Sequence, residues 1–154
     1  MKKIKKLLMF TLALAAIVVC FAFSSSAANT SGYYTYEVVN GKAKITDVNT
    51  SISGNVKIPS KIGNFTVAEI GNYAFEYCSS MKSVTIPSTV TSMGQYAFAH
   101  CGGITNVTIG SGLKVVPYAA FYDCYSLKTV TLGKNVSELG GSAFDSCKSL
   151  AEID

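Results

Sequence analysis

Hydrophobic positions along residues 70–154 recur with a fixed period of 23 residues. The segments 72–78, 95–101, 118–124 and 141–147 each place alanine directly before phenylalanine, and cysteine three residues after it. Such a period is typical of a solenoid, in which each coil buries its apolar side only against neighbouring coils. The pattern therefore predicts a stack of 23-residue coils.

Two extended stretches alternate within each predicted coil. In residues 81–86, 104–109 and 127–132, apolar positions alternate with polar ones and β-branched side chains are frequent. This alternation is typical of a strand with one buried face. Shorter apolar stretches follow, at residues 90–93, 113–116 and 136–139. We expect equivalent strands of successive coils to form a parallel sheet, with neighbours about 4.8 Å apart.

Turns separate these stretches and complete each coil. Pro87, Gly110 and Gly133 occupy equivalent turn positions. Proline ends a strand because it lacks an N–H group, and glycine is expected there to supply unusual backbone dihedrals. In the alanine–phenylalanine–cysteine segments the apolar residues fall at i, i+1 and i+4, which favours a short helical turn. The predicted fold is a mostly β solenoid with parallel strands and short helical corners.

The region before the repeats follows a different pattern. Residues 34–39 and 43–48 flank Asn40-Gly41, the strongest short-range signal for a β-hairpin. Residues 56–59 resemble a degenerate first repeat strand, followed by an expected loop near residues 63–65. Because the open end of a solenoid needs an atypical covering unit, we expect residues 28–69 to form an N-terminal cap.

The repeats are expected to span residues 70–154, with the last one truncated inside a strand at Asp154. A core that ends without a cap exposes apolar surface and an unpaired strand edge, and bare edges promote association. The sequence therefore predicts either self-association through this end or a fragment of a longer surface protein.

The first residues are typical of a secretory signal peptide. Lys2, Lys3, Lys5 and Lys6 precede an apolar run over residues 7–23, and small residues follow it. We expect residues 1–27 to be removed, which leaves a secreted or cell-surface protein without a membrane span.

Two other interpretations of this N-terminal segment remain. The apolar run approaches the length of a membrane anchor. A lipoprotein signal at Cys20 is disfavoured because Val19, instead of a small residue, precedes it.

Charge outside the leader is balanced. The formal net charge is +4, but four of the thirteen lysines lie in the leader, and the other nine are matched by nine acidic residues. The chain contains no arginine. A neutral body of this kind lacks the basic surface that nucleic acids require, so we expect no nucleic-acid partner.

The repeat resembles the BspA-type leucine-rich repeat, also called the Treponema pallidum-type repeat. The matching positions in one unit are Ile70-Gly71, Ala74-Phe75, Cys78, Met81, Val84 and Ile86-Pro87. Later units depart from the family pattern, with Pro117 in place of the first glycine and Gly110 and Gly133 in place of the proline. The resemblance implies a leucine-rich repeat solenoid on a secreted or cell-surface protein, often used for adhesion and protein binding.

The repeat cysteines are the first candidates for chemistry. Equivalent residues of stacked coils form a straight row, whereas zinc needs ligands that converge from several directions. Parallel Cβ vectors also disfavour disulfides between neighbouring coils, although an exported protein meets an oxidising environment. We favour free, buried cysteines.

His100, the only histidine, lies at a position that holds Tyr77, Asp123 and Ser146 in other coils, which is typical of a surface residue. The sequence predicts no catalytic, cofactor or metal site.

The remaining candidate is a polar contact face for a protein or glycan ligand. It would consist of the outward strand residues Ser83, Thr85, Asn106, Thr108, Thr129 and Thr131. Threonine also favours strands and cross-strand hydrogen bonds for purely structural reasons. If they are exposed, tyrosines at the corners are stronger anchors; these are Tyr73, Tyr96, Tyr118, Tyr122 and Tyr125.

We therefore expect a non-catalytic binding module, used for adhesion or protein–protein interaction. The alternative is a structural spacer, or the N-terminal part of a larger surface protein whose functional domain lies beyond residue 154.

Overall fold

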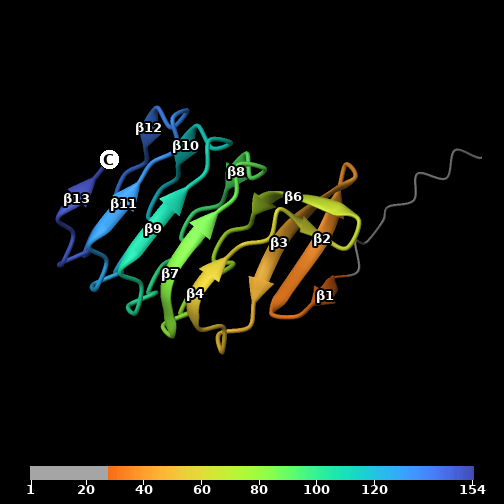
Figure 1. The fold of residues 1–154 in the computed structure, drawn as a ribbon, viewed down its shortest axis with the longest axis horizontal. Helices are drawn as coiled ribbons and strands as arrows, with labels where there is room; N and C mark the ends of the chain where they lie inside the picture. Colours follow the sequence, from red (N-terminus) through yellow and green to blue (C-terminus); the bar gives the residue numbers. More distant parts are fainter. Residues whose placement is uncertain (1–27) are drawn as a thin grey trace, which may run out of the picture.

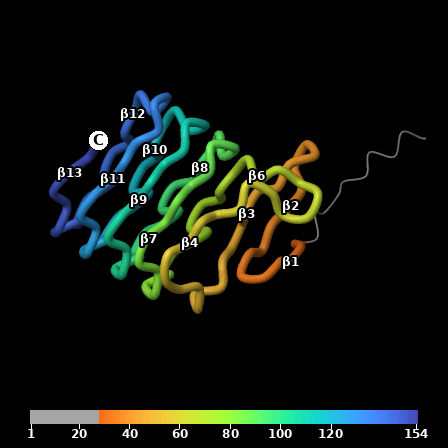
Figure 2. Tube along the Cα trace, viewed as in Figure 1, coloured from red at the N-terminus to blue at the C-terminus, as the bar shows by residue number. Residues whose placement is uncertain are grey.

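The stacked coils form one elongated body, in which the chain advances from the N-terminal cap to the C-terminus along the long axis (Figures 1 and 2). A computed structural model describes residues 28–154, so the expected signal peptide, residues 1–27, lies outside the described part. The strands are β1 (Asn29–Ser31), β2 (Tyr34–Val39), β3 (Lys42–Val48), β4 (Gly54–Lys57), β5 (Lys61–Ile62), β6 (Phe65–Ile70), β7 (Met81–Ile86), β8 (Ser92–Met93), β9 (Asn106–Ile109), β10 (Val115–Val116), β11 (Thr129–Thr131), β12 (Glu138–Leu139) and β13 (Glu152–Ile153).

The first strand of each coil contributes to a five-stranded sheet with the order β13-β11-β9-β7-β4. All its neighbouring pairs are parallel. Val84 pairs with Val107, and Val107 pairs with Val130, so each register step equals the repeat period. The parallel solenoid predicted from the 23-residue period is confirmed.

Shorter strands lie on the other side of the coils. β8 pairs with β6, and β10 pairs with β12, both in parallel. β6 also pairs in parallel with β3, which joins the cap to the first coils through continuous backbone pairing. The apolar residues of both sides point into one core between the two layers of strands.

The cap contains the expected hairpin. β2 and β3 are antiparallel, and the turn between them places Asn40 at φ 50° and Gly41 at φ 74°, as a tight hairpin turn requires. The loop expected near residues 63–65 is present as a tight turn at Gly63 and Asn64, which joins β5 and β6 in a second hairpin; Phe65 already belongs to β6. Gly63, at φ 57°, supplies the turn.

The corners are overlapping turns, and the prediction of short helical corners is wrong for residues 28–154. Two residues in each corner have a positive φ that a right-handed helix excludes, for example Tyr73 at 59° and Tyr77 at 60°. This backbone conformation points every second N–H group of the corner toward the next coil. The Phe75 amide, for example, donates to the Ala97 carbonyl oxygen at 2.8 Å. Bonds between coils therefore alternate with turn bonds inside each corner, such as the one from the Glu76 amide to the Tyr73 carbonyl oxygen at 2.9 Å, and no continuous helical ladder forms.

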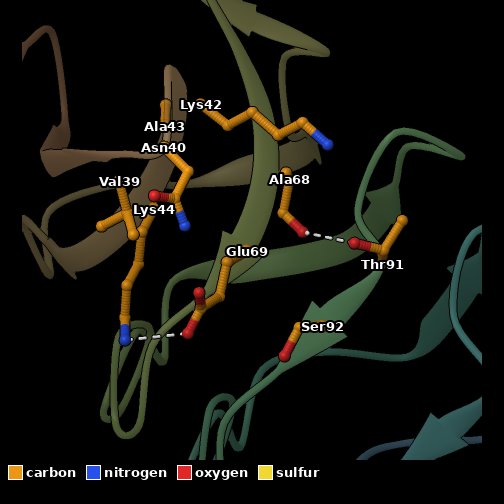
Figure 3. Close-up of a pocket in the computed structure, with 9 residues that line it drawn as sticks. All are labelled: Val39, Asn40, Lys42, Ala43, Lys44, Ala68, Glu69, Thr91 and Ser92. Carbon is orange, nitrogen blue, oxygen red and sulfur yellow. Dashed lines mark hydrogen bonds and ion pairs between the residues drawn. The ribbon is translucent and has the colours of Figure 1, made fainter.

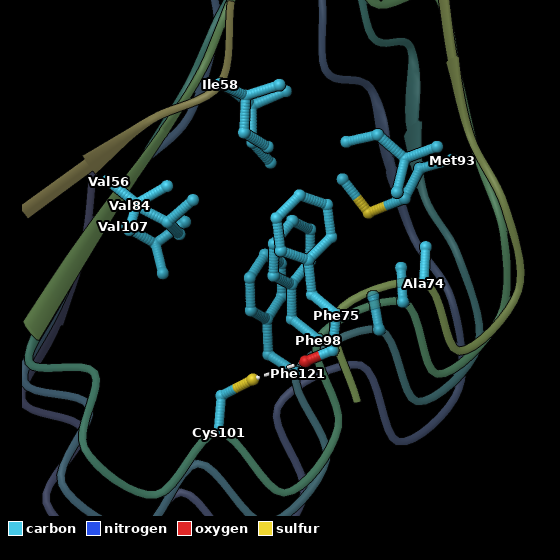
Figure 4. Close-up of a cluster of buried hydrophobic side chains, with 14 of the residues drawn as sticks. Val56, Ile58, Ala74, Phe75, Val84, Met93, Phe98, Cys101, Val107 and Phe121 are labelled. Carbon is cyan, nitrogen blue, oxygen red and sulfur yellow. Dashed lines mark hydrogen bonds between the residues drawn. The ribbon is translucent and has the colours of Figure 1, made fainter. Parts of the chain in front are cut away.

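A ladder of phenylalanines fills the centre of the coils (Figure 4). Phe75, Phe98 and Phe121 are fully buried, and the ring centroids of successive residues are 4.6 and 5.1 Å apart. Phe144 continues the stack at 5.4 Å but is only partly buried. At the other end the Tyr34 ring covers Phe75 edge-on at 6.3 Å. The cap thus closes the stack that the periodic phenylalanines predict.

Glycine is required at the turn positions for a different reason from the one expected. Neither Gly110 nor Gly133 has a positive φ. Instead, a Cβ atom on Gly110 would lie 2.5 Å from the backbone nitrogen of Ser88, and one on Gly133 would lie 2.3 Å from the Gly110 carbonyl oxygen. Glycine is required there because successive coils approach closely.

In the part of the chain that the structure describes, no helix has the length and apolar character that crossing a bilayer would require.

Candidate functional site

The threonine face is the outward side of the parallel sheet, formed by Ser83, Thr85, Asn106, Thr108, Thr129 and Thr131 on β7, β9 and β11. The strand register aligns these residues in two rows. Asn106, Thr108 and Thr131 are exposed, while the other three are partly covered. The structure therefore brings all six predicted contact residues together on one surface.

Hydrogen bonds between coils occupy one of these rows. The Ser83 hydroxyl donates to Asn55 Oδ1 at 3.0 Å, and the Asn106 side-chain amide donates to the Thr129 hydroxyl. Asn106 Oδ1 also accepts from Thr105 at 2.7 Å. These polar side chains stabilise the sheet by pairing with each other, which is the structural role expected of such residues.

A second surface lies at the corners between the short strand of one coil and the first strand of the next. Its members are aromatic, and we call it the tyrosine surface: Tyr73, Tyr77, Tyr96, Tyr118, Tyr122 and Tyr125, together with His100. Four of them rank among the exposed large side chains, with Tyr73 50% and Tyr77 60% exposed. The corner tyrosines were expected to be the stronger anchors for a ligand if they are exposed. Tyr73, Tyr118 and Tyr125 are exposed.

The rings of the tyrosine surface pack on one another across the coils. Tyr73 stacks on Tyr96 with centroids 5.1 Å apart, and Tyr96 also meets Tyr118 and Tyr122 edge-on. A second row begins with Tyr77, which stacks on the His100 imidazole at 4.8 Å. The rings in these contacts are thereby fixed in place while part of each remains open to solvent.

His100 is part of this packing. Its Nδ1 atom lies 3.1 Å from Asp123 Oδ2 on the next coil, and Tyr122 contacts the ring edge-on at 5.6 Å. The side chain is 28% exposed, so it is more enclosed than a typical surface histidine. The His100–Asp123 contact links two coils.

The corners carry only negative formal charge. The segments 72–78, 95–101, 118–124 and 141–147 contain Glu76, Asp123 and Asp145, and no lysine. Sequence reasoning did not include Tyr77 in this surface. The repeat period could have indicated Tyr77, because the equivalent residues one and two periods later are His100 and Asp123.

A groove with a volume of about 320 Å³ lies where the cap meets the first coils (Figure 3). A salt bridge crosses it, with Lys44 Nζ 2.8 Å from Glu69 Oε1. Its lining residues are Val39, Asn40, Lys42, Ala43, Lys44, Ala68, Glu69, Thr91 and Ser92. Several of these side chains are exposed, so the groove is shallow and does not enclose a ligand. Sequence patterns do not indicate this groove, because strands distant in the chain form its walls.

The repeat cysteines are free thiols in the structure, and all four are buried. Each of the last three donates its Sγ–H to the carbonyl of the phenylalanine one coil earlier, as Cys101 does to Phe75 at 3.0 Å (Figure 4). Burial raises the pKa of Cys78 to about 11, with a further increase from the charge of Asp47. Burial also raises the pKa of Cys101. Protonated thiols of this kind are poor nucleophiles.

Within residues 28–154, no cluster of three or more His, Cys, Asp or Glu side chains is arranged to hold a metal ion.

Comparison with known families decides the identity of the repeat. Residues 48–154 match the BspA type leucine rich repeat region in six copies. The chain belongs to the BspA-type leucine-rich repeat family. The match begins within the predicted cap, at the last residue of the hairpin strand β3. Members of this family are generally non-catalytic repeat modules.

Solved structures of bacterial leucine-rich repeat proteins share the fold. A leucine-rich repeat protein from Bacteroides capillosus is 27% identical, with a TM-score of 0.70 over 82% of this chain and 96% of that one. The T. pallidum leucine rich repeat protein is 25% identical, with a TM-score of 0.67 over 82% and 71% of the two chains. A leucine rich cell surface protein from Faecalibacterium prausnitzii is 25% identical, with a TM-score of 0.61 over 84% and 42%. A comparison with curated proteins finds no match.

Proposed function

We propose that this protein is a secreted or cell-surface interaction module that binds a protein or glycan partner through its repeat surface. The observation that carries this proposal is the concentration of exposed, mutually stacked aromatic rings on the tyrosine surface. Aromatic side chains are enriched at binding surfaces because they bury a large area and lose little conformational freedom. The role is non-catalytic adhesion or protein–protein interaction.

Two further observations support an extracellular location. The sequence of residues 1–27 is typical of a secretory leader. In addition, the F. prausnitzii structure with the same fold is described as a cell surface protein. Fractionation of cells that express the full chain tests this part: we expect the protein outside the cytoplasm with its leader removed. Retention of an uncleaved chain in the cytoplasm would contradict it.

The second candidate function is a structural spacer, alone or at the N-terminal side of a larger surface protein. The observation that favours it is one row of the threonine face, where the side chains of Ser83, Asn106 and Thr129 already form hydrogen bonds within the sheet. A row satisfied in this way has few free groups with which to recognise a ligand.

Adhesion of protein-coated beads to cultured epithelial cells distinguishes the two candidates. One variant carries Tyr77→Leu and Tyr118→Leu on the tyrosine surface, and the matched variant carries Thr108→Ala and Thr131→Ala on the threonine face. If the module binds through its aromatic rings, the first variant loses adhesion and the second retains it. Beads that never adhere above the level of uncoated beads would favour the spacer.

A further inference from the structure

Two exposed rings of the tyrosine surface stand on unusual backbone. Tyr73 and Tyr77 both have a positive φ, a conformation that is disfavoured for bulky residues and easier for asparagine, aspartate or glycine. The equivalent positions of the fourth coil hold Ser142 and Ser146. The fold therefore tolerates smaller residues there. The equivalent positions of every coil share this positive φ, so the backbone conformation belongs to the repeat, whereas the aromatic ring on it is not required by the fold.

The second coil fixes the orientation of both rings. Tyr73 lies nearly parallel to Tyr96, with 6° between the ring planes, and Tyr77 lies nearly parallel to His100, with 8° between them. Only one face of each ring takes part in these stacks, and both side chains remain at least half exposed. The first coil thus presents two aromatic faces whose orientation is set before any partner arrives.

The formal charge of the corner segments that carry these rings is negative. Glu76 lies between the two tyrosines in the chain, and Asp123 and Asp145 follow on later coils. The face of an aromatic ring is itself electron-rich and attracts cations. Rings and carboxylates therefore favour the same kind of ligand, a positively charged one. An anionic ligand would find no lysine in the corner segments 72–78, 95–101, 118–124 and 141–147.

We propose that the tyrosine surface binds a basic, extended segment of a partner protein, with arginine or lysine side chains lying over Tyr73 and Tyr77 beside the Glu76 carboxylate. This inference rests on the proposed binding function and specifies the chemistry of the partner. Cation–π contact would supply the selectivity for a charged side chain, and the carboxylates would steer the segment toward the surface.

A pair of fluorescent peptides tests the proposal by anisotropy titration with the purified chain. One alternates arginine with serine, and the other carries citrulline in place of each arginine, which keeps the size and removes the charge. We expect the arginine peptide to bind, with affinity that falls as salt is added, and the citrulline peptide to bind far more weakly. Tyr77→Leu should weaken binding about fivefold, while Tyr77→Phe, which keeps the ring, should retain it.

Matched variants separate a defined site from general charge attraction. Glu76→Gln should weaken binding, whereas Glu152→Gln removes the same charge at the edge strand β13 and should not. Tyr33→Leu, at a tyrosine of the cap that is 48% exposed, should leave binding unchanged. Equal losses in Glu76→Gln and Glu152→Gln, or equal binding of both peptides, would overturn the proposal.

Failure of this inference is distinguishable from failure of the proposed function. If the arginine peptide does not bind but the tyrosine variant still loses adhesion to cells, the binding function stands and the basic partner is wrong. Binding to neutral glycans on an array, abolished by Tyr77→Leu and without binding of the arginine peptide, would identify a glycan surface instead.

Discussion

The phenylalanine ladder makes Phe98 the position where one truncation should destabilise the protein most clearly. Its ring is fully buried between Phe75 at 4.6 Å and Phe121 at 5.1 Å. A buried aromatic side chain covers roughly 150–250 Å², and at about 25 cal/mol per Å² the lower value corresponds to about 4 kcal/mol. Truncations of buried aromatic residues to alanine cost about 3–5 kcal/mol. We expect Phe98→Ala to lose a free energy of unfolding in this range.

Two control variants calibrate this loss. Phe144→Ala removes a ring that is only partly buried and has a single stacked phenylalanine neighbour, so its cost should be smaller. Thr108→Ala removes an exposed side chain of the threonine face and should stay within about 0.5 kcal/mol.

Urea unfolding followed by far-UV circular dichroism measures all three variants. A shift of the midpoint at an unchanged slope reports a change in stability. If the midpoints of Phe98→Ala and Thr108→Ala coincided, the reasoning that places the phenylalanine period in a shared core would be refuted. A cost for Phe144→Ala equal to that of Phe98→Ala would refute the dependence on burial.

Three further predictions follow from the coils. Gly110→Ala should destabilise the fold by about 1–3 kcal/mol, because its Cβ would meet the Ser88 backbone, and an unchanged urea midpoint would contradict this close approach. The pKa of Cys78 rises from 9.0 to about 11 on folding, so between these values the unfolded chain has lost a proton that the native chain keeps. Stability should therefore fall as pH rises from 9 to 11, and Cys78→Ala should flatten that fall in urea midpoints measured across this range. Residues Glu152 and Ile153 of β13 pair with β11 alone and are exposed, so their amides should exchange hydrogen fastest among the parallel strands, and uniform protection by mass spectrometry would contradict this.

The candidate surfaces were only partly predictable. Alternation along β7, β9 and β11 is enough to place Thr108 and its neighbours on the outward side, because successive side chains of a strand point to opposite faces. The tyrosine surface needed the backbone of the corners. Whether Tyr73 is exposed depends on its positive φ and on the Tyr96 ring one coil later. Neither is visible in the order of apolar and polar residues.

The sequence by itself determined the repeat. Alanine, phenylalanine and cysteine recur in phase, and each coil can bury its phenylalanine only against the next, so the period implies the stacked core of Phe75, Phe98 and Phe121. The hairpin of the cap was equally clear, because Asn40 and Gly41 readily adopt the positive φ that a two-residue turn requires.

Tertiary structure alone decided the features that depend on contacts between coils. Corner amides pair with the neighbouring coil and so form turns where local spacing favoured a helix. Gly110 is glycine because the Ser88 backbone lies against it, and Cys101 bonds to the Phe75 carbonyl. These partners lie 22 and 26 positions away along the chain. Local sequence patterns indicate whether a residue faces the core, whereas the distance between stacked coils determines which of its atoms contact the neighbouring coil.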